Sequence, residues 1–304
     1  MKTMLASLRR RLTPSGRSVV IGVPFGFLLL FFMVPFLVVV QISFADIRLG
    51  VPPYTDLAEI KDGVVALKLN VSHYLSVLDD PLYFNAYVGS LKVATITTVI
   101  CLLIGYPAAY FIARANPDRR NLLMMAVMLP FWTSYLVRVY AWIGILKDQG
   151  LLNNLLLALH IIDEPLRLFH TNWAVYIGMV YSYLPYLILP LYAHLVRMDN
   201  TLLEAAHDLG APPWKAFLTI TLPLSARGVI AGSLLVFIPA VGEYVIPELL
   251  GGADTLMIGR LMWDDFFNNI DWPTASATTG VMVLLLLLPM VWFQRLQSKP
   301  VEVA

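Results

Sequence analysis

The stretch Asn200-Thr-Leu-Leu-Glu-Ala-Ala-His-Asp-Leu-Gly-Ala-Pro-Pro-Trp-Lys-Ala-Phe-Leu-Thr-Ile-Thr-Leu-Pro223 carries more structural information than any other part of the chain. Thr201 followed by Glu204 fits a capping box, which predicts the start of a short helix. Gly210 predicts the end of that helix, because glycine adopts the left-handed conformation at little steric cost. The Pro212-Pro213 pair suits the first turn of a second helix. The stretch therefore predicts a bent pair of helices.

Around this stretch, the composition is that of a membrane protein. Of the 304 residues, 59% are hydrophobic and 13% are charged, and the mean hydropathy is +0.73. Soluble domains are roughly half apolar and about a quarter charged, so a soluble globular protein is excluded. A helix needs about 20 apolar residues to cross the hydrocarbon core. Six stretches qualify and predict an all-α integral membrane protein with six transmembrane helices, roughly at Val19–Ile42, Tyr87–Ala113, Leu122–Leu146, Trp173–Ala193, Val229–Leu250 and Thr274–Phe293.

The distribution of basic residues predicts the orientation, because Lys and Arg favour cytoplasmic loops. With the N-terminus in the cytoplasm, the six spans leave thirteen basic and five acidic residues on the cytoplasmic side. Six basic and fourteen acidic residues then lie on the outer side. The reverse orientation would place the basic majority outside. We therefore expect both termini in the cytoplasm.

The chain is interpreted as one membrane domain with peripheral additions. Residues 1–18 are a basic cytoplasmic segment, and 19–84 hold the first transmembrane helix and a long periplasmic loop. Residues 85–295 form a five-helix core that includes the loop 200–223, and 296–304 are a cytoplasmic tail.

Prolines interrupt several of the predicted spans, at Pro24, Pro35, Pro107, Pro130, Pro185, Pro190, Pro239 and Pro247. Proline removes a backbone hydrogen bond from a helix and kinks it. So many breaks favour a moving or cavity-lining bundle over a passive anchor. Simple kinking is the alternative at each individual site.

The loop between the fourth and fifth spans resembles the coupling loop of ABC importer permeases. Glu204-Ala-Ala, three residues, Gly210, nine residues, Ile220, one residue and Leu222-Pro223 match that family's signature at every position. The resemblance implies a type I ABC importer permease fold, with cytoplasmic coupling helices that dock on an ATP-hydrolysing subunit. The residues implied in this contact are Glu204, Ala205, Ala206, Asp208 and Gly210. An amphipathic helix at the membrane surface is the alternative for this loop.

Three further stretches are similar to the polyamine branch of these permeases: Leu129–Trp142, Gly242–Gly252 and Phe266–Pro273. The likeness is closest to a putrescine permease subunit, but spermidine permeases look similar, so the amine stays open. The resemblance implies a bacterial inner membrane location and a polyamine substrate. It also implies a second, homologous permease subunit, two ATP-binding subunits and a periplasmic polyamine-binding protein as partners. No nucleic acid is expected as a partner.

The substrate path is expected to contain acidic and aromatic residues, because both lower the cost of moving a cation into a low-dielectric layer. Glu243 is the one acidic residue deep within the predicted spans, and Arg138 lies at a similar depth, roughly 10 Å inside the outer helix end at the helical rise. Glu243 either meets the amine or pairs with Arg138 as a structural ion pair, and a switch between the two is a further hypothesis. Tyr183, Tyr186 and Tyr244 are the aromatic candidates for the path, with packing as the alternative.

The outer side carries a group of acids that includes Glu248, Asp264, Asp265 and Asp271. Negative charge there would concentrate cations near an entrance. The same residues would equally suit a docking surface for the solute-binding protein, and a merely solvated loop is the third reading.

The sequence contains no phosphate-binding loop, nucleophile elbow or metal motif. We therefore expect a chain that is not an enzyme and binds no cofactor, with ATP and magnesium bound by the partner ATPase. An importer for another small solute is the nearest alternative. An ion-driven secondary carrier is the alternative from another class, but it would be expected to hold coupling carboxylates near the midplane and inverted repeats.

Overall fold

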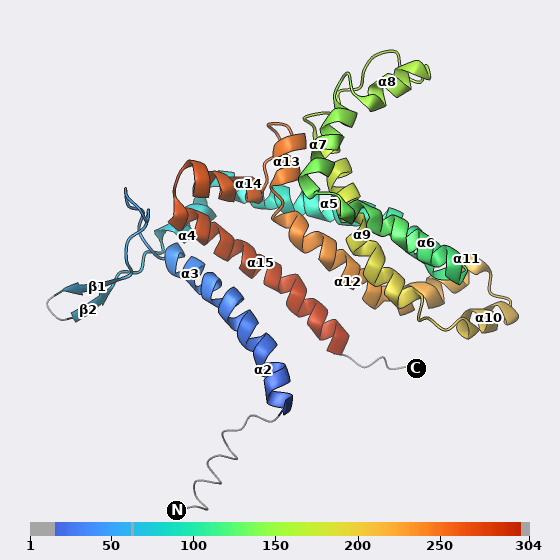
Figure 1. The fold of residues 1–304 in the computed structure, drawn as a ribbon, viewed down its shortest axis with the longest axis horizontal. Helices are drawn as coiled ribbons and strands as arrows, with labels where there is room; N and C mark the ends of the chain where they lie inside the picture. The colour runs from blue at the N-terminus through green and yellow to red at the C-terminus, as the bar shows by residue number, and fades with distance from the viewer. Residues whose placement is uncertain (1–15, 62–63, 299–304) are drawn as a thin grey trace, which may run out of the picture. The chain divides into compact units, whose positions relative to one another are not determined.

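The computed structural model describes residues 16–61 and 64–298. Within these ranges, five helices are long and apolar enough to cross a membrane (Figure 1). They are Val20–Ser43, Pro81–Arg114, Asn172–Leu195, Pro213–Val241 and Trp272–Val291. A bent pair of helices supplies a sixth candidate, so the predicted helical membrane fold is confirmed. Residues 1–15 of the predicted basic segment and 299–304 of the predicted tail lie outside the described residues.

The third predicted span is wrong as a single helix. Its residues form α6 (Pro117–Met128), a 3-10 turn η2 (Leu129–Trp132) and α7 (Tyr135–Leu146), which continues toward α8 (Leu151–Ala158). The two halves meet at an angle of 91°. Thr133 closes the turn, because its N–H and its hydroxyl both donate to the Pro130 carbonyl, at 3.3 and 2.9 Å. Pro130 within the tightened turn accounts for the break, since proline does not fit a helix interior.

The fifth predicted span has the wrong bounds. The continuous helix comprises α11 (Pro213–Ala216), a π-turn η3 (Phe217–Thr221) and α12 (Leu222–Val241). After a break at Gly242, a separate short helix, α13, covers Val245–Leu250. Pro247 occupies the first turn of α13, where its missing N–H costs least. Glu243 therefore lies in a helix break, not inside a continuous span.

The chain divides into two compact units. The first contains the described residues up to Val77 together with Asn269–Val281. Its elements are α2 (Gly16–Leu28), the π-turn η1 (Leu29–Met33), α3 (Val34–Ser43), the antiparallel pair β1 (Ala58–Lys61) and β2 (Val64–Leu67), most of α4 (Ser72–Asp79) and the start of α15 (Trp272–Ser298). This hairpin is the only β-sheet within the described ranges.

Helix α4 connects the helices of the first unit through side-chain contacts. The Tyr74 hydroxyl lies 2.7 Å from the Ser43 hydroxyl at the end of α3. The neighbouring His73 lies 3.1 Å, Nδ1 to Oγ1, from Thr274 at the start of α15. Two polar contacts on consecutive residues of α4 thus join elements that are some 200 positions apart in the chain.

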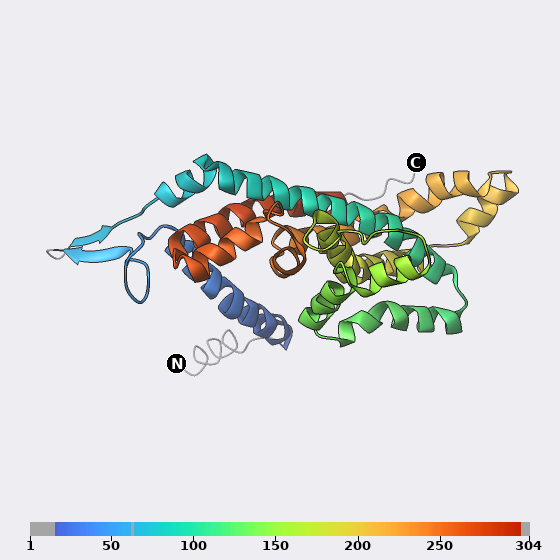
Figure 2. The same cartoon turned by 90° about the horizontal axis from the view of Figure 1, so that it is seen from above.

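The second unit is built on three helices that pack pairwise: α5 (Pro81–Arg114), α9 (Asn172–Leu195) and α12 (Figures 1 and 2). Glycines allow their close approach to Leu187 of α9. A Cβ on Gly232 would lie 2.9 Å from the Leu187 carbonyl oxygen, and a Cβ on Gly105 would lie 2.6 Å from its Cδ2. A larger residue at Gly232 would meet backbone and force the helices apart, whereas one at Gly105 would require the Leu187 side chain to shift.

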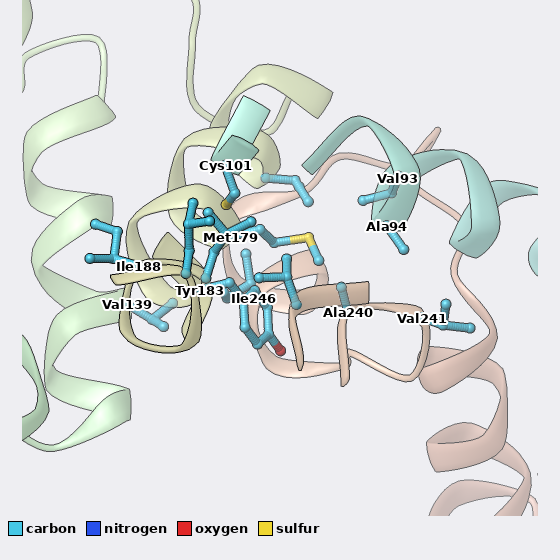
Figure 3. Packing of buried hydrophobic residues seen from close by; sticks show 14 of the residues in the cluster. Val93, Ala94, Cys101, Val139, Met179, Tyr183, Ile188, Ala240, Val241 and Ile246 are labelled. Atoms are coloured by element: carbon cyan, nitrogen blue, oxygen red, sulfur yellow. The ribbon is translucent and has the colours of Figure 1, made fainter. Parts of the chain in front are cut away.

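Shorter elements of the second unit gather around one end of these three helices. Helix α13 packs on α7 and α9, and α14 (Ile258–Trp263) packs on α5. Figure 3 shows buried side chains of these elements together, with Val139 of α7, Tyr183 of α9 and Ile246 of α13 in one cluster. This packing brings the break at Glu243 next to α7 and α9.

Candidate functional site

Helix α10 (Thr201–Asp208) and α11 form the predicted bent pair, called here the helical hairpin (residues 199–216). Its expected capping box is wrong, because Thr201 is already the first residue of the helix. The Asp199 carboxylate instead accepts the Thr201 N–H at 3.0 Å. This hydrogen bond also lowers the pKa of the Asp199 carboxyl below its ordinary value. A carboxylate at the start of a helix also interacts favourably with the helix dipole.

The end of α10 forms as predicted. Gly210 has a φ of +78°, in the left-handed region. Its N–H donates to the His207 carbonyl at 2.9 Å, and the Ala211 N–H donates to the Ala206 carbonyl at 2.9 Å. These two bonds are a Schellman motif, which satisfies the last carbonyls of the helix. Gly210 is therefore required by the backbone conformation.

The residues expected to contact an ATPase lie mostly on the surface of the hairpin. Glu204, Ala205, Asp208 and Gly210 are exposed, and Ala206 is half-buried. Next to them, Leu209 is 89% exposed. Their role in that contact stays a prediction.

The hairpin is tied to α5 directly and through the π-turn η3 that follows it. Arg114, at the end of α5, donates from Nη1 to the Asn200 side-chain oxygen. Phe217 of η3 packs edge-on against Tyr106 and Tyr110, with ring centroids 5.5 and 5.9 Å apart. A movement of the hairpin would therefore be transmitted to α5 as well as to α12.

Glu243 is buried in the break between α12 and α13, with 9% of its surface exposed. One carboxylate oxygen accepts the Val245 N–H at 3.0 Å, so the side chain caps the start of α13. The other oxygen accepts a hydrogen bond from the Tyr183 hydroxyl of α9. The carboxylate thus joins two helices and is held in one orientation.

Of the two alternatives for Glu243, the ion pair with Arg138 is not formed within the described part of the chain. The Arg138 guanidinium carbon lies instead 5.6 Å from the ring centre of Tyr135 and 5.8 Å from that of Phe131. Its Nε and Nη1 are buried without a hydrogen-bond partner. Aromatic faces therefore hold this cation where a carboxylate was expected.

Four aromatic residues surround these charges and are called here the aromatic cluster: Phe131, Tyr135, Tyr183 and Tyr186. Tyr186 lies between two members, with ring centroids 5.1 Å from Phe131 and 6.0 Å from Tyr183. Tyr135 interacts electrostatically with both Glu243 and Arg138. The candidate residues Glu243, Arg138, Tyr183 and Tyr186 are thus brought together, whereas Phe131 was missed. The neighbouring Pro130, which breaks the helix beside Phe131, is the signal that could have identified it.

Tyr244 does not join the aromatic cluster. Its ring stacks on Trp263 with a centroid distance of 4.5 Å, and Trp263 in turn packs on Phe267 at 4.1 Å. The two adjacent residues of this helix break therefore lie in different surroundings. Glu243 accepts a hydrogen bond from Tyr183, whereas Tyr244 stacks on Trp263 of α14.

Most of the outer acids already have structural partners. Glu248 forms a 3.0 Å ion pair with Arg260, and the buried Asp265 accepts the Tyr83 hydroxyl at 2.7 Å. Asp264, in the π-turn η4 (Asp264–Asn268), accepts the Asn268 amide at 2.7 Å. Asp271 belongs to the other unit, where it accepts the Thr274 N–H at 3.0 Å and caps α15. These partners reduce, without abolishing, the negative charge available to a solute.

Comparison with known proteins adds a family to this geometry. The family model described as "Binding-protein-dependent transport system inner membrane component" matches residues 102–303. The chain is 37% identical over 289 residues to the "Spermidine/putrescine transport system permease protein PotB" of Haemophilus influenzae, over 94% of this chain and 96% of that protein. It is 40% identical over 280 residues to the PotB of Escherichia coli K12, over 91% and 97%.

A more distant relative is the "Inner membrane ABC transporter permease protein YdcU" of E. coli K12, 30% identical over 268 residues, with 84% and 80% of the two chains covered. These relatives are described as permeases, not as enzymes. The names of the first two include both amines, so the expected likeness to a putrescine permease is replaced by a likeness to spermidine/putrescine permeases.

Solved structures agree on the fold. One chain of a bacterial ABC transporter that imports the acidic polysaccharide alginate matches with a TM-score of 0.64 at 16% identity, over 93% of this chain and 97% of that one. The MetNI methionine ABC transporter matches with a TM-score of 0.55 at 13% identity, over 71% and 94%. The fold is that of type I ABC importer permeases.

Proposed function

The chain belongs to the family of binding-protein-dependent transport system inner membrane components, and from this premise we propose that it is the permease subunit of an ATP-driven polyamine importer. Putrescine is the proposed substrate, with spermidine as the alternative, since both amines occur in the names of relatives that are 37% and 40% identical. The observation that carries the proposal is the buried Glu243 carboxylate inside the aromatic cluster.

This cluster offers the groups that a protonated amine needs on leaving water. A carboxylate neutralises one ammonium charge, and each aromatic face contributes about 0.5–2 kcal/mol of cation–π attraction. Tyr183 and Tyr186 line the site from α9, and Tyr135 lines it from α7. A buried acid without a complementary cation is costly. Glu243 is therefore the proposed contact for one ammonium group.

Coupling to ATP is proposed to pass through the helical hairpin. Glu204, Ala205, Ala206, Asp208 and Gly210 would contact one of two ATP-binding subunits, which bind ATP and magnesium. Closure of those subunits would push the hairpin and, through the contacts at Arg114 and Phe217, move α5 and α12. In this proposal a second permease subunit completes the path, and both termini lie in the cytoplasm, in accord with the Lys and Arg distribution.

The outer acids are proposed to attract the substrate before it enters. Asp264 and Glu248 lie near the ring of Tyr244, with which both interact electrostatically. A periplasmic polyamine-binding protein would release the amine close to these groups.

Uptake by the complete complex in proteoliposomes tests the proposal. With its ATPase, second permease and binding protein present, the complex is expected to take up labelled putrescine or spermidine in an ATP-dependent manner. Glu243→Gln should reduce uptake tenfold or more, because a charge-assisted contact of about 1.5–3 kcal/mol is lost.

The matched control is Glu164→Gln, which neutralises an exposed acid of the loop before α9 and should leave uptake unchanged. Failure to transport any amine would contradict the substrate, and full activity of Glu243→Gln would contradict the site.

A further inference from the structure

We propose that Arg138 is a tethered cation that competes with the amine for the ammonium site of the path and has to leave when the amine enters. The inference rests on the proposed function, because it assigns a competitor to the same site. It concerns affinity and gating, which the family assignment does not address.

The surroundings of Arg138 are those expected for a bound amine. Its guanidinium carbon lies within 6 Å of two ring centres, at 5.6 Å from Tyr135 and 5.8 Å from Phe131. This is the range in which any organic cation is attracted to an aromatic face. A ligand ammonium and a guanidinium would therefore compete for the same two rings.

The hydrogen bonding of Arg138 is incomplete. Its Nε and Nη1 are buried and have no hydrogen-bond partner among the described residues. Buried donors without partners are unfavourable, so the guanidinium is held by the rings and by charge alone. Such an arrangement favours a side chain that moves over one that is locked in place.

The charge balance of the site makes the two cations mutually exclusive. Glu243 is the one carboxylate found to interact with Tyr135 and Tyr183, whereas Arg138 supplies a positive charge beside Tyr135. With Arg138 present the pair is neutral. The entry of a diamine would leave two or more uncompensated positive charges in a half-buried site, which is disfavoured. Departure of the guanidinium removes one of these positive charges, so that Glu243 is left to compensate the ammonium group it meets.

The helix break offers a way to remove it. Phe131 belongs to η2, before the 91° bend, whereas Tyr135 and Arg138 belong to α7, after it. The two rings that hold the guanidinium therefore lie on opposite sides of a hinge. A change of the bend would separate them and release Arg138.

Removal of the tethered charge should raise the affinity for the amine. A site that is occupied by its own side chain shows an apparent affinity reduced by the fraction of time it is free. In the reconstituted complex, Arg138→Gln is expected to lower the KM for uptake about fivefold or more, whereas Arg138→Lys, which retains a tethered cation, should stay near wild type. Arg167→Gln, an exposed arginine in the loop before α9, is the matched control.

Inhibition by added guanidinium chloride at non-denaturing concentration gives a readout that a structural role would not move. Guanidinium should inhibit uptake by Arg138→Gln, because it refills the vacated rings, and should affect the wild type far less. If Arg138→Gln does not assemble with its partners, Arg138→Met replaces it, with the same expectations.

Two results would overturn the proposal: an unchanged or raised KM in the neutral variants with no new guanidinium inhibition, or failure of both neutral variants to assemble. The second result would identify Arg138 as a structural group. Glu243→Gln separates this proposal from the proposed function. A defect in Glu243→Gln with no effect of Arg138→Gln rejects the tethered cation alone, whereas normal uptake by Glu243→Gln rejects the site itself.

Discussion

The helical hairpin and the aromatic cluster are built in opposite ways. The bonds that shape the hairpin join neighbours in the chain, such as Asp199 with Thr201 and Ala211 with Ala206. The aromatic cluster, by contrast, collects residues from η2, α7 and α9 around Glu243 in the break before α13, and Tyr183 and Glu243 are 60 positions apart. A locally defined element can keep its shape while it moves as a body. A site assembled from several elements changes whenever one of them moves.

The largest effect is expected from breaking the cluster at Glu243. Glu243→Ala removes the cap of α13 and leaves the Tyr183 hydroxyl buried without its acceptor. The cost is about 1–3 kcal/mol for each buried group left unsatisfied. We expect uptake to fall to background and the thermal unfolding temperature of the complex to drop.

The variant Glu243→Gln serves as its control, because its amide oxygen can still accept the Val245 N–H and its amide NH2 can donate to the Tyr183 hydroxyl. It should restore the unfolding temperature but not the uptake. Equal unfolding temperatures for Glu243→Ala and the wild type would show that the carboxylate does not stabilise the break.

A smaller effect is expected where the two regions are mechanically connected. Arg114→Ala removes the contact with Asn200 that fastens the hairpin to α5. ATP hydrolysis by the complex should continue, but uptake per ATP should fall about threefold to tenfold, because an exposed hydrogen bond is worth roughly 0.5–1.5 kcal/mol. The ratio of labelled amine to released phosphate measures this coupling.

Arg119→Ala is the matched control, since Arg119 is an exposed arginine in the next helix. An unchanged ratio in both variants would mean that the hairpin acts on α12 alone.

The smallest effect is expected within the hairpin itself. Gly210→Ala places a side chain at a φ of +78°, which costs about 1–2 kcal/mol. A Cβ there meets no atom within 4 Å, so backbone strain is the sole cause. We expect a reduction of ATP-driven uptake of severalfold, with normal assembly.

Gly144→Ala tests the reasoning, because a Cβ at Gly144 also meets no atom within 4 Å but its φ is not positive. It should have no effect on uptake. Equal behaviour of the two alanine variants would show that the left-handed residue is dispensable.

The same contrast explains what could be predicted from the sequence. The left-handed Gly210 and the helix that follows Pro212 were predictable, because the chemistry of adjacent residues determines them. Even here the start of α10 was wrong, since Asp199 caps the helix in place of the Thr201–Glu204 box. The side chains of Asp199 and Glu204 can both accept the Thr201 N–H, and the direction of the chain before the helix determines which of them does.

The cluster was only partly predictable. Glu243 stood out as an acid in apolar surroundings, but its location depends on a helix break that hydropathy does not register. The contact of Arg138 with Phe131 depends on the bend between α6 and α7. Arg138 contacts aromatic rings and no carboxylate, because the cost of desolvating the guanidinium and its attraction to neighbouring groups depend on the folded geometry. Spacing along the chain contains no information on that balance.

The π-turn at Phe217–Thr221 has a consequence for the length of the hairpin signature. A π-turn holds one residue more than an α-turn, which shifts the helical phase by about 100°. The inserted residue therefore sets the direction of the Phe217 ring relative to the buried face of α12. Deleting one residue there would rotate the hairpin by about a quarter of a circle, away from the ATP-binding subunit that it is proposed to contact. The nine residues between Gly210 and Ile220 therefore determine the rotation of the hairpin about the helix axis as well as its distance from α12.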